Sequence, residues 1–153
     1  MNSIFNSPAE VSMRILIILS ISNKSKDIDT LTAIDFISTY SKDFKINDYN
    51  LHGDNNYNFS GFASRRVLIQ KSLSLLLKKH YVKAIDSKNG IEYIIIEEQK
   101  KVCEKLNSTY SKKYKEIVKE VLYKLKNKSS KRIINELNYH ITSIALWLAS
   151  TIS

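Results

Sequence analysis

The stretch KKHYVKAIDSKNGIEYIII, residues 78–96, decides the fold. It begins as the end of a basic helix and continues as two apolar runs, YVKAID and IEYIII. Asn89 and Gly90 lie between these runs, and this dipeptide supplies the positive φ angles that a tight hairpin turn requires. The pattern predicts a helix followed by a β-hairpin, which is how the recognition helix and wing of a winged-helix DNA-binding domain look in sequence.

Two helices are predicted near the N-terminus. The first begins after Ser7, a favoured N-cap residue, with Pro8 in its first position, and its long apolar run predicts burial on most sides. In the middle of the second helix, Asp35 lies among apolar residues. A buried charge requires a partner, so we expect Asp35 to pair with Arg14 or Arg65.

The second helix is expected over residues 30–44 and the third over residues 62–81. The Asn-rich segment between them is predicted to be a long loop, which is uncommon in compact domains unless it has a function. Three helices and a hairpin together predict a winged-helix-like domain over residues 4–98.

Two further helices are predicted after the hairpin. From residue 97 apolar residues return to helical spacing, which predicts one helix of about 28 residues that ends near Leu125. A last helix is expected to begin near Ser129 or Ser130 and to run to the C-terminus. These two helices form a C-terminal extension over residues 99–153, so the predicted fold class is mainly α with one β-hairpin.

The closing stretch ITSIALWLASTI, residues 141–152, contains no charged residue. It is too short to cross a bilayer, so we expect no membrane partner. Large apolar patches are rare on monomers and Trp is favoured at binding hot spots, which makes Ile144, Trp147 and Leu148 a candidate partner interface. A helix of the protein's own core would explain the same run equally well.

The net charge of +9 is concentrated in the second part of the chain. Residues 1–60 contain 5 Lys/Arg and 7 Asp/Glu, whereas residues 61–153 contain 19 and 8. A positive field attracts polyanions, so double-stranded DNA is a candidate non-specific partner. A lysine-rich composition that reflects an AT-rich genome would produce the same excess.

Basic residues on the predicted third helix and wing are candidate DNA contacts, because winged-helix domains place that helix in the major groove. The third helix has few short polar residues that suit base readout, so we expect contacts that do not depend on sequence. Salt bridges within the fold, or a protein partner, would explain the two arginines equally well. The candidates are Arg65, Arg66, Lys71, Lys78, Lys79 and Lys88.

No constellation of residues predicts catalysis, so we expect neither an enzyme nor a cofactor. The three His lack a spacing typical of metal sites, and the lone Cys103 has no second cysteine. His52 lies in a loop near Asp54, and we expect no catalytic role for this pair. A single buried thiol is typical of proteins of the reducing cytoplasm, where we expect this chain to be located.

Six stretches, in order and at matching spacing, resemble the middle component of ABC-three-component systems, the small subunit of Lamassu-type bacterial defence operons. The resemblance covers roughly residues 4–126. The stretches are FNSPAEVSMRILIIL (5–19), LTAIDFISTYSKDF (31–44), LHGD (51–54), SRRVLIQKSLSLLLKKHYVK (64–83), NGIEYIIIEE (89–98) and LNSTYSKKYKEIVKEVL (106–122).

The resemblance implies an adaptor subunit that carries no catalysis of its own. Such a subunit bridges an SMC/Rad50-like ATPase and an effector, often a nuclease, in defence against phages and plasmids. The alternative is a free-standing homodimeric winged-helix transcriptional regulator. That regulator would bind duplex DNA tightly and selectively without a partner, whereas weak binding by an adaptor would collapse with added salt.

Overall fold

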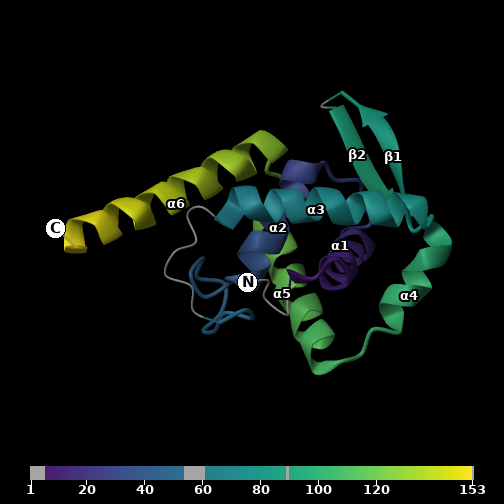
Figure 1. Ribbon diagram of the computed structural model, residues 1–153, viewed down its shortest axis with the longest axis horizontal. Helices are drawn as coiled ribbons and strands as arrows, with labels where there is room; N and C mark the ends of the chain where they lie inside the picture. The colour runs from purple at the N-terminus through teal and green to yellow at the C-terminus, as the bar shows by residue number, and fades with distance from the viewer. Residues whose placement is uncertain (1–5, 54–60, 89, 153) are drawn as a thin grey trace.

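The computed structural model of the protein describes residues 6–53, 61–88 and 90–152, with the side chains described as far as residue 142. The elements in this part of the chain confirm a mainly helical fold with one antiparallel hairpin (Figure 1). They are α1 (Pro8–Ser22), α2 (Ile28–Thr39), α3 (Gly61–Lys78), β1 (Val82–Ser87), β2 (Gly90–Ile95), the 3-10 turn η3 (Glu97–Gln99), α4 (Lys100–Glu104), α5 (Thr109–Leu125) and α6 (Ser130–Ile152).

Helix α1 begins as the sequence predicts. The Ser7 hydroxyl accepts a hydrogen bond from the Glu10 amide at 3.2 Å, and Pro8 follows it in the first turn. Asn23 ends the helix with a φ of 52°, a left-handed conformation that asparagine tolerates. Val11 and residues 15–19 are buried in the apolar core, so α1 is covered on most sides.

The hairpin pairs Val82 with Ile95 at its base and Ser87 with Gly90 at its tip. Gly90 has a φ of +106°, a conformation that favours glycine. The segment between α1 and α2 adds to this sheet at the free edge of β2, because Lys26 and Tyr93 exchange two backbone hydrogen bonds of 3.0 and 2.8 Å. The hairpin projects from the C-terminal end of α3 (Figure 1), which is the place of a wing.

Helix α2 is the centre of the fold. Residues 30–41 are all buried, because α1, α3, α5 and α6 pack around the helix. The expected range of 30–44 is wrong at both ends, since Asp27 caps the helix at its N-terminus and turns follow Thr39. A helix covered on every side must satisfy its polar side chains inside the protein.

The single helix predicted from residue 97 to Leu125 is wrong. The structure has η3, α4, a turn and then α5. Ser108 starts α5 by accepting a hydrogen bond from the Ser111 amide at 3.1 Å, and the Lys115 ammonium donates to the carbonyls of Cys103 and Leu106 at 2.6 Å each. These hydrogen bonds satisfy backbone amide and carbonyl groups that a break in a helix leaves without partners. The apolar spacing of the sequence continues across the break.

Helix α6 begins at Ser130, as predicted, and packs against α2 through the buried Ile133 and Leu137. These residues belong to the same apolar core as α1, α2 and α3. The helix then runs outward, with the C-terminus at its far end (Figure 1). Within the described residues, no helix has the length and apolar character that a membrane crossing requires.

Candidate functional site

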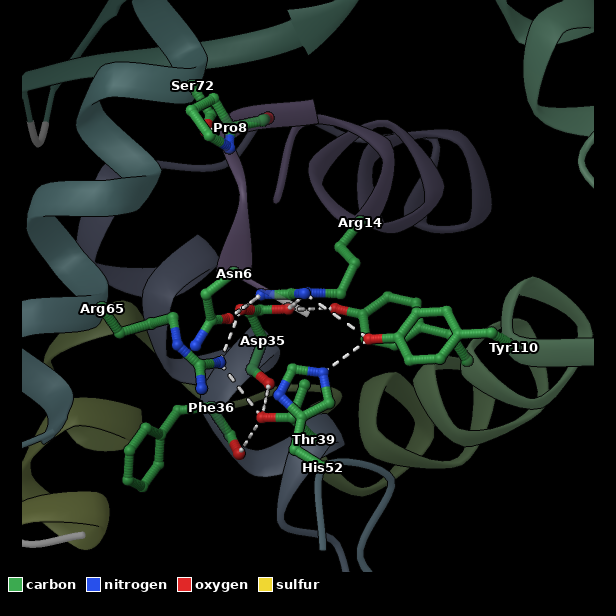
Figure 2. Close-up of polar contacts among 11 residues, drawn as sticks. Asn6, Pro8, Arg14, Asp35, Phe36, Thr39, His52, Arg65, Ser72 and Tyr110 are labelled. Carbon is green, nitrogen blue, oxygen red and sulfur yellow. Dashed lines mark hydrogen bonds and ion pairs between the residues drawn. The ribbon is translucent and has the colours of Figure 1, made fainter. Parts of the chain in front are cut away.

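Asp35, in the middle of α2, is the centre of a buried polar cluster (Figure 2). Its carboxylate has no exposure to solvent and accepts four hydrogen bonds. We call this group the Asp35 cluster. Its members come from six segments of the chain and are Asn6, Arg14, Asp35, Thr39, His52, Arg65, Tyr110 and Tyr114.

Two arginines bind the carboxylate of Asp35. Arg14 on α1 is bidentate, with Nε at 2.8 Å from Oδ1 and Nη2 at 3.1 Å from Oδ2. Arg65 on α3 places Nη1 at 2.7 Å from Oδ2. The expected pairing of Asp35 is therefore confirmed for both arginines at once. Charged hydrogen bonds of this kind are the strong ones, because burial excludes competing water.

The second arginine brings a positive charge that Asp35 alone does not balance. Aromatic rings accommodate it, since the Arg65 guanidinium lies 5.7 Å from the ring centroids of both Phe36 and Tyr40. Arg65 Nη1 also donates to the Thr39 hydroxyl at 3.0 Å. The side chain is 4% exposed, so α2 and α3 are joined through a buried ion pair.

Two tyrosines of α5 complete the cluster. Tyr114 is fully buried and donates its hydroxyl hydrogen to Asp35 at 2.6 Å. Tyr110 lies one turn earlier, where its hydroxyl is 2.6 Å from Nε2 of His52. The Arg14 guanidinium reaches outward to Tyr110 at 3.5 Å and to Asn6 at 3.1 Å. The cluster thus ties the N-terminal segment and the loop after α2 to the helices.

Burial and neighbouring charges shift the pKa values of three groups in the cluster. Burial alone would raise the pKa of Asp35, but the charges of Arg14 and Arg65 outweigh burial and keep this pKa well below its usual value. Burial, with Arg14 nearby, lowers the pKa of His52 to about 3. Burial also raises the pKa of Tyr110 to about 12. A general acid or base works best with a pKa near the working pH. The pKa values of Asp35, His52 and Tyr110 all lie far from pH 7.

One of the candidate DNA contacts, Arg65, belongs to the Asp35 cluster. Arg65 is buried against Asp35, so its guanidinium would have to leave the core to reach a phosphate. Arg66 is one residue further round the helix and lies at the surface, where it pairs with Asp29 at 2.7 Å. Its side chain is 42% exposed.

The four candidate lysines are exposed. Lys71 and Lys78 lie two turns apart on the outward face of α3, and Lys79 follows in the turn after the helix. Lys88 lies in the turn at the tip of the hairpin, directly after Ser87, the last residue of β1. The candidate partner residues Ile144, Trp147 and Leu148 belong to α6, but their side chains lie outside the described residues.

Several members of the cluster were not predicted as a site. The sequence does not single out Tyr110 or Tyr114, and it draws attention to His52 only together with Asp54, which lies outside the described residues. Every member of the cluster lies in a stretch that carries the resemblance, so the resemblance is the signal that could have found them. Among the described residues, no group of His, Cys, Asp and Glu is arranged to hold a metal ion. Cys103 is buried, and burial raises the pKa of its thiol.

Comparison with known proteins gives one match. The family model described as ABC-three component (ABC-3C) system Middle Component 2 matches residues 4–146. This range contains the whole Asp35 cluster, the hairpin and most of α6. No curated protein and no solved structure matches the chain.

Proposed function

We propose, from the premise that this chain belongs to the Middle Component 2 family of ABC-three component systems, that it is a non-catalytic adaptor subunit. As a component of a three-component system, it works with other subunits. In our proposal it bridges an SMC/Rad50-like ATPase and an effector nuclease, as in Lamassu-type defence against phages and plasmids. Contact with double-stranded DNA is auxiliary and does not depend on sequence.

The Asp35 cluster is the observation that carries this proposal. Its charged groups point inward and bind one another, and its pKa values suit permanent charges better than proton transfer. An adaptor must hold separate surfaces in fixed relative positions. A buried network that joins α1, α2, α3 and α5 at one carboxylate supplies that rigidity.

The outward face of α3 supports contact with a protein. Val67 is 50% exposed and Leu75 is 40% exposed, and they lie two turns apart on the face that also carries Lys71 and Lys78. Aliphatic side chains gain free energy when a partner covers them, whereas phosphates gain nothing from them. This mixed face suits a protein partner with acidic groups, and leaves the lysines available for weak contact with DNA.

The end of α6 is the second proposed partner surface. The helix leaves the body of the protein, and its sequence there is uncharged over the stretch that contains Ile144, Trp147 and Leu148. Trp147→Asp should therefore release a partner while the helical circular dichroism of the chain stays unchanged. Thr142→Asp, at an exposed position of the same helix, is the matched control. Retention of every partner by folded Trp147→Asp would remove this surface from the proposal.

A pull-down from the native host tests the function as a whole. The chain, tagged at its N-terminus, should co-purify with a long coiled-coil ATPase and with an effector subunit. A homodimer that elutes alone, and that binds one duplex sequence selectively, would instead establish a transcriptional regulator. Binding to DNA should be measured at two or more salt concentrations, because adaptor-type contacts weaken steeply with salt.

A further inference from the structure

An open groove of about 600 Å³ lies on the surface, and no member of the Asp35 cluster lines it. Three parts of the chain form its walls: the connection between α1 and α2, strand β2, and the turn from α5 to α6. Its volume lies in the range of ligand-binding clefts. Residues more than 90 positions apart in the sequence meet here, since Ser130 bonds to the side chains of both Thr30 and Asp27.

Lysines dominate the charge of this groove. Lys24 and Lys26 approach from one wall, and Lys119 and Lys126 from another. Among the residues that the structure describes, no carboxylate forms a salt bridge with any of these four ammonium groups. A fifth lysine in the lining, Lys128, is already paired with Glu136 at 2.7 Å.

Two carboxylates also line the groove, and both are occupied. Ser130 donates its hydroxyl hydrogen to Asp27 at 2.8 Å, and Ser25 donates to Glu92 at 2.5 Å. Asp27 also accepts the Thr30 amide as the cap of α2. Their contacts hold the walls together, and the lining keeps an excess of positive charge because five lysines face two carboxylates.

Lys26 is the best-positioned cation of the set. Its backbone is fixed in both directions to Tyr93, so the side chain starts from a rigid base. Burial, together with the charge of Lys24, lowers the pKa of Lys26. An ammonium group that has lost part of its hydration gains more from an arriving carboxylate than an ammonium group that is fully in water.

Apolar side chains form part of the same surface. Ile21, Leu122 and Leu125 line the groove and are partly buried, and the ring of Tyr123 at the rim is 73% exposed. The Lys126 ammonium lies 5.1 Å from the centroid of that ring. The groove therefore offers cations beside apolar contact area, which is the composition of a surface that binds a peptide.

We propose that this groove binds an acidic segment of a partner subunit, whose carboxylates contact Lys24, Lys26, Lys119 and Lys126 and whose aliphatic side chains lie on Ile21, Leu122 and Leu125. The inference rests on the proposed adaptor function and names the chemistry of one partner. A nucleic acid fits less well, because its regularly spaced phosphates would meet Asp27 and Glu92. A peptide can place its carboxylates at the lysines alone.

Photo-crosslinking in the assembled complex tests the inference directly. A benzoylphenylalanine in place of Tyr123 should crosslink to a partner segment rich in Asp and Glu, identified by mass spectrometry. The same group in place of Tyr139, which is 78% exposed on α6 and is not part of the groove, is the control. Crosslinks to nucleic acid, or to a basic or uncharged segment, would overturn the inference.

Charge reversal gives a quantitative test. Lys26→Glu with Lys126→Glu should weaken binding of the partner at least tenfold at 0.15 M salt, and the loss should shrink as salt rises. Lys101→Glu with Lys112→Glu, at exposed positions outside the groove, makes the same change in net charge. If both double variants captured all partners, the proposed binding of an acidic segment in the groove would be overturned, but the adaptor function would not. An unmodified chain that captures no subunit would overturn the adaptor function, and with it the inference.

Discussion

Tyr114 donates its hydroxyl hydrogen to Asp35 at 2.6 Å, which joins two residues 79 positions apart in the sequence. Both side chains are fully buried. The bond attaches α5 to the central helix at the carboxylate that also binds Arg14 and Arg65. The helices after the wing are therefore fixed to the helices before it by a polar contact as well as by apolar packing.

The charge of Asp35 should be essential for stability. Asp35→Asn keeps the shape of the side chain but leaves two buried arginines without a counter-charge, so we expect a loss of about 3–5 kcal/mol in the free energy of unfolding. Denaturation in urea at neutral pH measures this loss. Asp29→Asn is the control, because its ion pair with Arg66 is half exposed and should contribute less than about 1 kcal/mol. Equal losses in the two variants would contradict a special role of the cluster.

Removal of the Tyr114 hydroxyl isolates one contact of the cluster. Tyr114→Phe keeps the ring in the core and deletes a hydrogen bond to a charged acceptor, so we expect a loss of about 1.5–3 kcal/mol. The measurement is again the unfolding free energy. Tyr123→Phe, at a position that is 73% exposed, should change stability by less than about 0.5 kcal/mol.

His52 should make stability depend on pH. Its pKa is about 3 in the folded protein and roughly 6.5 when unfolded, so folding favours the neutral ring. The contribution of neutral His52 to the free energy of unfolding is fully present above the unfolded pKa. It is lost as the pH falls from 6.5 toward 3. By pH 5 we expect a loss of about 1–2 kcal/mol relative to pH 7.5.

Unfolding at a series of pH values, with His52→Gln beside the unmodified chain, checks this dependence. The variant should lose less stability between pH 7.5 and pH 5. The exposed His80 provides the comparison, and His80→Asn should retain the full loss. Parallel curves for the unmodified chain and His52→Gln would assign the dependence to other groups.

Ser108 should set the start of α5. Ser108→Ala removes the hydroxyl that accepts the Ser111 amide, so we expect a loss of about 1 kcal/mol. Thermal or urea unfolding measures it. Ser74→Ala, at an exposed position inside α3, removes a hydroxyl that caps no helix and should be close to neutral. If Ser108→Ala left the stability unchanged, the contacts of Lys115 would be sufficient to stabilise the break before α5.

Contact of α3 with DNA should be visible in the salt dependence of binding. If Lys71 and Lys78 each neutralise a phosphate, Lys71→Glu with Lys78→Glu should reduce the slope of log Kobs against log salt by about 2. Fluorescence anisotropy with a labelled duplex of arbitrary sequence gives the slope. An unchanged slope would exclude these lysines as phosphate contacts. Arg65→Glu is not a usable probe, since it places a second carboxylate beside Asp35.

Local patterns predicted much of the fold. Ser7 and Pro8 start α1, and Asn-Gly marks a hairpin, because a cap and a turn depend on a few neighbouring residues. The pairing of Asp35 with arginine followed from the cost of an unpaired buried charge. The break before α5 was missed, because the apolar spacing continues across it and Lys115 closes it from a distance.

The sequence by itself determined that adjacent arginines, Arg65 and Arg66, lie on the third helix of a helix-and-hairpin fold. Only the tertiary structure decided which of them is buried. Successive residues of a helix point about 100° apart, so burial depends on where α2 crosses α3, and no local pattern contains that position. The crossing places Arg65 against Asp35 and leaves Arg66 at the surface with Asp29. The position of this crossing therefore makes Arg65 a structural cation and leaves Arg66 where a partner can reach it.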